Sequence, residues 1–179
     1  MSSTKSKNKI HLLILTGSVG VGKSSVAEAI SNILSSKSIP NAIIDLDYLR
    51  HAHPEPQNDP FHMKLGYKNL ASIWRNYENI GITHLIIPNV VENKKELKEF
   101  KSAIPNADIH IIRLKADIKT IHDRLKRRDT GESLKWHLNR AIVLTKQLKS
   151  TKIEDLVVDT KNKFITTIAK EIIFKIGWL

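Results

Sequence analysis

A glycine-rich stretch near the start of the chain has the residue types needed to hold phosphate. Residues 17–24 match the pattern G-x-x-x-x-G-K-[ST] in full. Its glycines let the backbone turn tightly and bring N–H groups close to phosphate oxygens. Lys23 adds a positive charge against the β- and γ-phosphates, and the Ser24 hydroxyl is a hard oxygen ligand for Mg²⁺. The nucleotide-binding residues predicted from this pattern are Gly17, Ser18, Val19, Gly20, Val21, Gly22, Lys23, Ser24 and Ser25.

The sequence on either side of this stretch suits the same role. An apolar strand is expected over residues 11–16, and helical spacing begins near Lys23. The helix would present its N-terminal donors and the positive end of its dipole to a bound anion. Because strand, loop and helix stand in register, we interpret the motif as a site for ATP with Mg²⁺ and not as a chance match. The motif predicts nucleotide binding and leaves the reaction open.

Two carboxylates follow the second expected strand, residues 42–46. Ligands of doubly wound sheets bind beyond the carboxyl ends of the strands, so Asp45 and Asp47 should lie near the phosphate loop. In an extended chain both side chains would point the same way. We expect Asp47 to accept the proton of an attacking hydroxyl, and Asp45 to lie on the metal and acceptor side. The alternative is that Asp47 caps a helix starting at Tyr48 and that Asp45 is merely polar.

Other polar residues are candidates for binding the group that accepts a phosphate. Arg50 is placed to bind a polar or anionic part of the acceptor. Glu92, just past the third strand, is expected either to hydrogen-bond an acceptor hydroxyl or to begin a helix. Further candidates for the pocket are His51, His53, His62, Asn69 and Trp74, of which Trp74 is favoured as a core residue.

Arginines cluster ahead of a Thr130-Gly131 break. Arg124 and Arg128 are four residues apart and share a helix face. Phosphoryl transfer needs cations that neutralise charge on the transferring group, which is the role we expect for Arg128. Arginines beside a glycine hinge suit a short lid around residues 124–140 that closes over the nucleotide. An exposed basic face, or contacts to nucleic acid, are the alternatives.

Strands and helices alternate along the chain, which predicts a three-layer α/β/α sandwich with a five-stranded parallel sheet. One domain is expected over residues 10–179, after a disordered basic tail of residues 1–9. Strands are expected at 11–16, 42–46, 84–87, 109–114 and 155–158. Helices are expected at 24–34, 61–77, 94–103, 117–128, 133–149 and 164–176, with an irregular loop at 51–60.

Composition narrows the classes of protein. The chain has no cysteine, which excludes disulfides and cysteine zinc sites, and no apolar run approaches the length of a membrane span. A cytoplasmic protein without a membrane partner is therefore expected. The formal net charge is +11, which favours anionic partners and admits nucleic acid. Because the lysines are dispersed, we give more weight to a solvated basic surface.

Three segments together resemble the adenylate-kinase-like group of P-loop small-molecule kinases, such as adenylylsulfate kinase, gluconate kinase and chloramphenicol phosphotransferase. They are residues 17–24, the Asp-Leu-Asp-Tyr-Leu-Arg run at 45–50, and the basic run at 124–128. The resemblance implies a P-loop NTPase fold. It also implies that Arg50 binds the acceptor, that Arg124 stacks on adenine, and that Arg128 reaches phosphate. Residues 157–160 resemble the strand-end turn beside the adenine ring.

The chain also departs from that group. The third strand ends in Pro88-Asn89 and carries no Walker B aspartate, and the lysine-rich lid segment of adenylylsulfate kinases is missing. The expected function is ATP-dependent transfer of the γ-phosphate to a hydroxyl of a small molecule such as an antibiotic, sugar or nucleoside. A polynucleotide 5′-hydroxyl kinase and a non-enzymatic ATP-binding switch are the alternatives. The acidic pair argues against a switch, which needs no proton acceptor.

Overall fold

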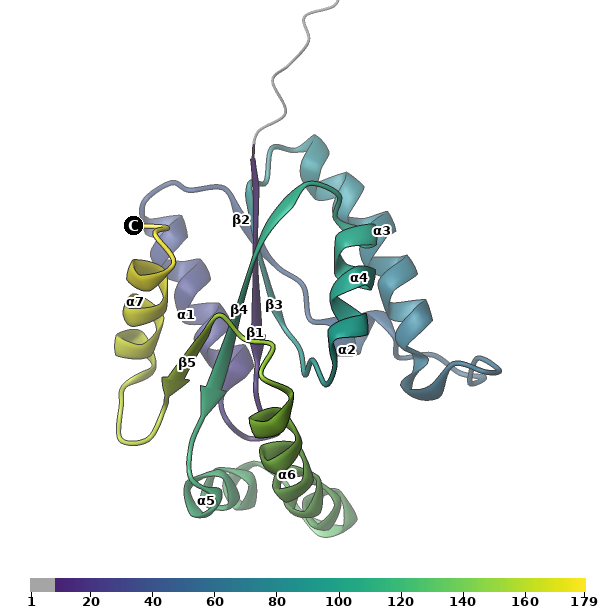
Figure 1. Ribbon diagram of the computed structural model, residues 1–179, viewed down its shortest axis with the longest axis vertical. Helices are drawn as coiled ribbons and strands as arrows, with labels where there is room; N and C mark the ends of the chain where they lie inside the picture. Colours follow the sequence, from purple (N-terminus) through teal and green to yellow (C-terminus); the bar gives the residue numbers. More distant parts are fainter. Residues whose placement is uncertain (1–8) are drawn as a thin grey trace, which may run out of the picture.

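The fold is a parallel β-sheet covered by helices on both faces, as the sequence predicts (Figure 1). The computed structural model describes residues 9–179. The prediction of a disordered tail at residues 1–9 falls, apart from Lys9, outside the described residues. All strand pairings are parallel, and the strand order is β2-β3-β1-β4-β5. The strands are β1 (Ile10–Thr16), β2 (Asn41–Ile43), β3 (His84–Pro88), β4 (Ala107–Lys115) and β5 (Leu156–Asp159).

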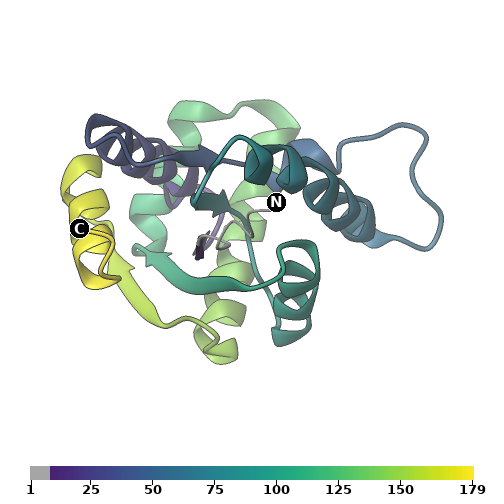
Figure 2. The same ribbon diagram turned by 90° about the horizontal axis from the view of Figure 1, so that it is seen from above.

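Each expected helix is present in the described chain, with ends shifted by a few residues. The helices are α1 (Lys23–Ser36), α2 (Leu46–Leu49), α3 (Met63–Asn79), α4 (Lys94–Ala103), α5 (Ile118–Arg128), α6 (Gly131–Thr151) and α7 (Ile165–Lys175), with a 3₁₀ turn η1 (Pro60–His62). Residues 51–59 form no helix or strand, as expected. This loop extends away from the body beside the start of α3 (Figures 1 and 2).

The central strand β1 builds both layers of the core through the alternation of its side chains. Leu12 and Ile14 pack with buried residues of α3 and α4, whereas Leu13 and Leu15 pack with those of α1 and α7. Figure 2 shows α3 and α4 on one side of the sheet and α1 and α7 on the other. Trp74 is 2% exposed in the first of these layers, so its favoured assignment to the core is confirmed. Burial of a strand on both faces explains its continuous apolar sequence.

Helices α5 and α6 stand apart from these two layers. They lie beyond the carboxyl end of the sheet, at the bottom of Figure 1. A small core of Ile121, Leu125 and Ala141 holds the two helices together. The pair therefore covers the edge of the sheet at which the loops after β1, β2 and β3 emerge. No helix within residues 9–179 combines the length and the apolar character that crossing a membrane requires.

Candidate active site

The carboxyl ends of the strands border a cavity of about 1310 Å³, larger than the roughly 300–1,000 Å³ common for small-molecule pockets. The loops after β1, β2, β3 and β5 contribute to its wall, together with α3 to α7. The structure brings most of the sequence-predicted site residues to this one wall. They are Val19, Gly20, Val21, Gly22, Lys23, Ser24, Ser25, Asp45, Asp47, Arg50, Glu92, Arg124 and Arg128.

Two predicted residues of the phosphate loop, Gly17 and Ser18, lie behind this wall and hold the loop in place. A Cβ atom on Gly17 would stand 2.5 Å from the carbonyl oxygen of Leu114 in β4, at a φ of +145°. The Ser18 hydroxyl is buried and donates to the carbonyl oxygen of Ala141 in α6, at 3.1 Å. The loop is therefore fastened to β4 on one side and to α6 on the other.

Gly20 shows why the loop needs glycine at a second point. Its φ is +78°, and a Cβ atom would lie 2.8 Å from Cγ of Leu125 in α5. A side chain here would meet both a disfavoured backbone conformation and a buried leucine. The absence of a side chain lets the loop pass directly beneath α5.

Lys23 folds over the phosphate loop. Its Nζ donates to the carbonyl oxygens of Gly17 at 3.0 Å and Ser18 at 3.2 Å. Burial lowers the pKa of Lys23 to about 8; Asp47 and Asp45 oppose this shift. The ammonium group thus sits where desolvation disfavours its charge, and an anion bound in the loop would favour that charge again.

The acidic pair has a different local structure from the one expected. Strand β2 ends at Ile43, and Asp45 is the N-cap of the short helix α2 that starts at Leu46. Its Oδ1 accepts a hydrogen bond from the backbone N–H of Asp47, at 3.0 Å. The predicted extended conformation over residues 42–46 is therefore wrong, because a capped helix follows the strand at once.

The alternative that Asp47 caps a helix beginning at Tyr48 is wrong for the same reason, since the capping residue is Asp45. Burial raises the pKa of Asp45, and the hydrogen bond from the backbone of Asp47 acts against that rise. Both residues nevertheless line the cavity. The helix turn thus brings the two carboxylates to the same wall, as alternation in an extended chain would have done.

Arg50 is committed to groups of the protein. It forms an ion pair with Asp47 and also donates to the carbonyl oxygen of Phe61, at 3.3 Å, and to the sulfur of Met63. Its side chain is 24% exposed. These contacts fasten α2 to the chain that leads into α3 and set the orientation of the Asp47 carboxylate.

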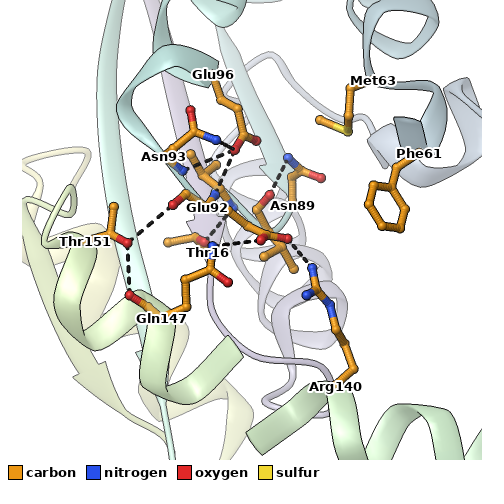
Figure 3. Close-up of polar contacts among 12 residues, drawn as sticks. Thr16, Phe61, Met63, Asn89, Glu92, Asn93, Glu96, Arg140, Gln147 and Thr151 are labelled. Carbon is orange, nitrogen blue, oxygen red and sulfur yellow. Dashed lines mark hydrogen bonds and ion pairs between the residues drawn. The ribbon is translucent and has the colours of Figure 1, made fainter. Parts of the chain in front are cut away.

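Glu92 joins the loop after β3 to helix α6 (Figure 3). Its carboxylate accepts from a terminal nitrogen of Arg140 and from Nε2 of Gln147, the latter at 2.9 Å. The Thr151 hydroxyl donates to its backbone carbonyl oxygen at 3.3 Å. Glu92 does not begin α4, because the N-cap of that helix is Asn93.

The loop that carries Glu92 is tied to the end of β1. The buried hydroxyl of Thr16, directly before the phosphate loop, accepts from the backbone N–H of Val91 at 3.0 Å. Asn89 lies in the same loop, 3% exposed, where the chain was predicted to lack a Walker B aspartate (Figure 3). The phosphate loop and the loop after β3 are therefore held as one unit.

Arg124 connects three parts of the site. Its guanidinium donates to the carbonyl oxygen of Val21 and to both the hydroxyl and the carbonyl oxygen of Thr160, each at 3.0 Å. Thr160 follows β5, at the turn that the sequence comparison placed beside adenine. Arg124 thus links α5, the phosphate loop and the turn after β5.

Arg128 is more loosely held. Its only recorded partner among the described residues is Asp129, which accepts from Nε at 2.8 Å and from Nη2 at 3.0 Å. Asp129 also pairs with Nδ1 of His137, at 2.8 Å, and Arg128 keeps its pKa below the usual value. The Arg128 side chain is 55% exposed and lines the cavity. It is a cation at the site that is held by a single carboxylate.

Sequence reasoning missed several residues of the cavity wall, namely Phe61, Met63, Tyr67, Glu96 and Trp136. Phe61 and Trp136 are 71% and 56% exposed, which apolar patterning does not anticipate. Four of the candidates for the pocket, His51, His53, Asn69 and Trp74, are not on this wall. His62 is also absent from it, and its Nδ1 lies 2.9 Å from the carbonyl oxygen of Arg50.

The residues present fit an Mg²⁺ ion that arrives with a nucleotide. Within residues 9–179 no group of three His, Asp or Glu side chains is placed to hold a metal alone. Ser24 and Asp45 are oxygen donors on the cavity wall beside the phosphate loop. Such a donor set is what Mg²⁺ uses when phosphates and waters supply its other ligands.

Comparisons with known proteins place this geometry in a structural context. No protein-family model matches the chain, and no curated protein sequence matches it. An APS kinase from Mycobacterium tuberculosis, solved with AMPPNP and APS, is similar with a TM-score of 0.63 and 20% identity, covering 95% of this chain and 99% of that one. A gluconokinase from Sinorhizobium meliloti is similar with a TM-score of 0.59 and 17% identity, covering 96% and 94%.

A shikimate kinase from Bacteroides thetaiotaomicron is similar with a TM-score of 0.65 and 13% identity, covering 93% of this chain and 98% of that one. At these identities the likeness shows the fold. The chain has the fold of the P-loop small-molecule kinases, in agreement with the resemblance found in the sequence.

Proposed function

We propose that this protein is an ATP-dependent kinase that transfers the γ-phosphate of ATP to a hydroxyl group of a small molecule. The observation that carries the proposal is the shared wall of one cavity. A full phosphate loop with Lys23 stands there beside two carboxylates, Asp45 and Asp47, and the cavity continues past them between α3 and α6. The kinases of like fold support a reaction of this kind, namely the APS kinase, the gluconokinase and the shikimate kinase.

The phosphates of ATP would lie against the backbone N–H groups of the phosphate loop and the start of α1. Lys23 would leave its two carbonyl partners and place its ammonium group against the β- and γ-phosphates. Mg²⁺, held through Ser24 and Asp45, would neutralise charge on the phosphate oxygens. On this proposal Arg124 shapes the end of the cavity that receives the base, through Val21 and Thr160.

In the chemical step the acceptor hydroxyl oxygen attacks the γ-phosphorus in line with the bond to the β-phosphate oxygen. The new O–P bond forms as that bond breaks, ADP leaves, and the hydroxyl proton passes to the carboxylate of Asp47. Arg50 would hold this carboxylate in position through their ion pair. Arg128 would exchange its contact with Asp129 for one with the transferring phosphoryl group.

The test separates nucleotide binding from transfer. Calorimetry with Mg²⁺ and AMPPNP should show one site in the full chain and none in Lys23→Met. A coupled assay of ADP release, run across a set of alcohols, sugars and nucleosides, should find an acceptor that stimulates turnover. That stimulation should disappear in Asp47→Asn while AMPPNP still binds. Unchanged nucleotide binding by Lys23→Met, or full stimulated turnover by Asp47→Asn, would overturn the assignment of the site or of the base.

A further inference from the structure

We propose that the acceptor is an uncharged or cationic alcohol with an apolar body, and that the site excludes anionic acceptors. This inference deepens the proposed function and rests on it. It concerns the acceptor half of the cavity, defined as the wall residues between 45 and 99 together with those between 136 and 144. Two features of this half carry the inference, its charge and its exposed aromatic rings.

The charges of the acceptor half run against those of the whole chain. The formal net charge of the chain is +11. The acceptor half carries six carboxylates, Asp45, Asp47, Asp59, Glu92, Glu96 and Glu99, against four cations, Arg50, Lys64, Lys95 and Arg140. The basic surplus of the protein therefore lies elsewhere, and a phosphate-rich acceptor such as a nucleic acid would meet a wall with an excess of acidic groups.

Both arginines in this half are already paired with carboxylates of the protein. Arg50 pairs with Asp47, and Arg140 pairs with Glu92, with the two arginine side chains only 24% and 26% exposed. An arginine fork is the group best suited to bind a carboxylate or phosphate of a ligand. Here an anionic acceptor would have to displace Asp47 or Glu92 and leave that carboxylate without its partner, which is costly.

The cations that remain lie at exposed positions. Lys64 and Lys95 are both exposed, and Nζ of Lys64 donates to the carbonyl oxygen of Asn58 at 3.3 Å. An exposed ammonium group is strongly hydrated and interacts weakly with a single ligand charge. These two lysines are therefore poor substitutes for a free arginine as anion receptors.

The remaining surface of the acceptor half is apolar and partly aromatic. Phe61 and Trp136 line it with 71% and 56% of their surface exposed, and Met63 and Tyr67 contribute beside them. Figure 3 shows Phe61 and Met63 on one side and the pair of Glu92 and Arg140 on the other. Exposed rings in a concave site are suited to pack against an apolar or planar ligand.

The backbone at Phe61 supports a role for this ring. Its φ is +57°, in the left-handed region that side chains rarely adopt. The carbonyl oxygen of the same residue accepts from Arg50. Strained positions of this kind tend to occur at ligand sites, where the surrounding structure holds them. The conformation keeps a phenyl ring at the cavity wall rather than in the core.

The test uses two fluorescent probes that differ by one charge. N-phenyl-1-naphthylamine and 8-anilino-1-naphthalenesulfonate share an anilinonaphthalene body, and only the second carries a sulfonate. Each is titrated into the full chain saturated with AMPPNP and Mg²⁺, which blocks the phosphate loop. We expect saturable binding of the neutral probe at a Kd at least tenfold below that of the sulfonate.

Matched variants locate that binding. Phe61→Ala should weaken the neutral probe about tenfold, with Trp136→Ala as a second, independent variant on the opposite wall. Phe174→Ala is the control, since Phe174 is 79% exposed on α7 and outside the cavity. Glu92→Gln should release Arg140 and narrow the difference between the two probes. Circular dichroism checks that each variant is folded.

The outcomes are distinct from those that bear on the kinase proposal. Equal affinity for the two probes, no saturable binding of the neutral probe, or indifference to both Phe61→Ala and Trp136→Ala would overturn the inference. Stimulated ADP release with a carboxylate such as gluconate, but not with its neutral analogue glucitol, would also overturn it while leaving the kinase proposal intact. Loss of AMPPNP binding with preserved probe selectivity would remove only the kinase proposal.

Discussion

The lowered pKa of Lys23 makes nucleotide binding dependent on pH. In the nucleotide-free protein burial lowers this pKa to about 8, from a model value of 10.5. Phosphate oxygens beside the ammonium group would favour its charged form and raise the pKa again. Between these two pKa values the protein must take up a proton when it binds a nucleotide. The binding constant should therefore fall as pH rises above about 8.

The size of the effect follows from the protonated fraction of Lys23. With a pKa of about 8, roughly nine-tenths of the free protein carries the proton at pH 7 and roughly one-tenth at pH 9. If the bound form stays protonated throughout, the apparent affinity for AMPPNP with Mg²⁺ drops about tenfold between pH 7 and pH 9. The terminal phosphate of the nucleotide loses its own last proton below this range and adds nothing to the slope.

Calorimetry at pH 9 measures the proton directly. Two buffers with different enthalpies of ionisation should give binding enthalpies that differ by the uptake of close to one proton. Lys23→Arg is the matched control, because the guanidinium stays charged throughout the range and should give no uptake. Equal affinities of the unaltered protein at pH 7 and pH 9, with no proton uptake, would refute the idea that burial of this lysine controls the phosphate loop.

The remaining predictions concern the loop, the arginine link and the acidic pair. Gly20→Ala should lower the free energy of unfolding in urea by about 2–4 kcal/mol, because strain at its positive φ adds to a clash with a leucine of α5, whereas Gly22→Ala, with no atom within 4 Å of a built Cβ, should show the smaller cost of about 1–2 kcal/mol from its backbone alone. Arg124→Ala should lower it by about 2–3 kcal/mol and weaken AMPPNP binding, since three hydrogen bonds to the loop and to the turn after β5 are lost. Asp47→Asn should reduce acceptor-stimulated kcat by roughly 10²- to 10⁴-fold, whereas Asp45→Asn should chiefly raise the Mg²⁺ concentration that turnover requires. The reverse pattern in kcat and Mg²⁺ titrations would exchange the two roles.

The sequence predicts those parts of the structure that local rules determine. The phosphate loop is readable because glycine spacing, a buried strand and a helix start must coincide there. The alternation of Leu12 to Leu15 in β1 has one solution, a strand buried on both faces. Helix α4 has the expected bounds, since Asn93 and Glu96 form a capping box at its start.

The acceptor half was poorly predicted because its structure depends on long-range pairs. The partners of Glu92 come from a helix about fifty residues further along the chain, and no local pattern announces that contact. Phe61 and Trp136 look like core residues in any apolar count, yet they line a cavity. The error at Asp45 is of another kind, since an N-capping signal was present and was assigned to Asp47 instead.

The same contacts restrict how the expected lid at residues 124–140 could close. Arg124 is fastened to the phosphate loop and to Thr160, and Arg140 is fastened to Glu92. Ser18 holds the next turn of α6 through Ala141. Both ends of the segment are thus tied to the parts that bind phosphate and acceptor, which leaves the residues around the break between α5 and α6 as the portion free to move. Arg128, held there by a single neighbouring carboxylate, is then the group that such a movement would deliver to a phosphate.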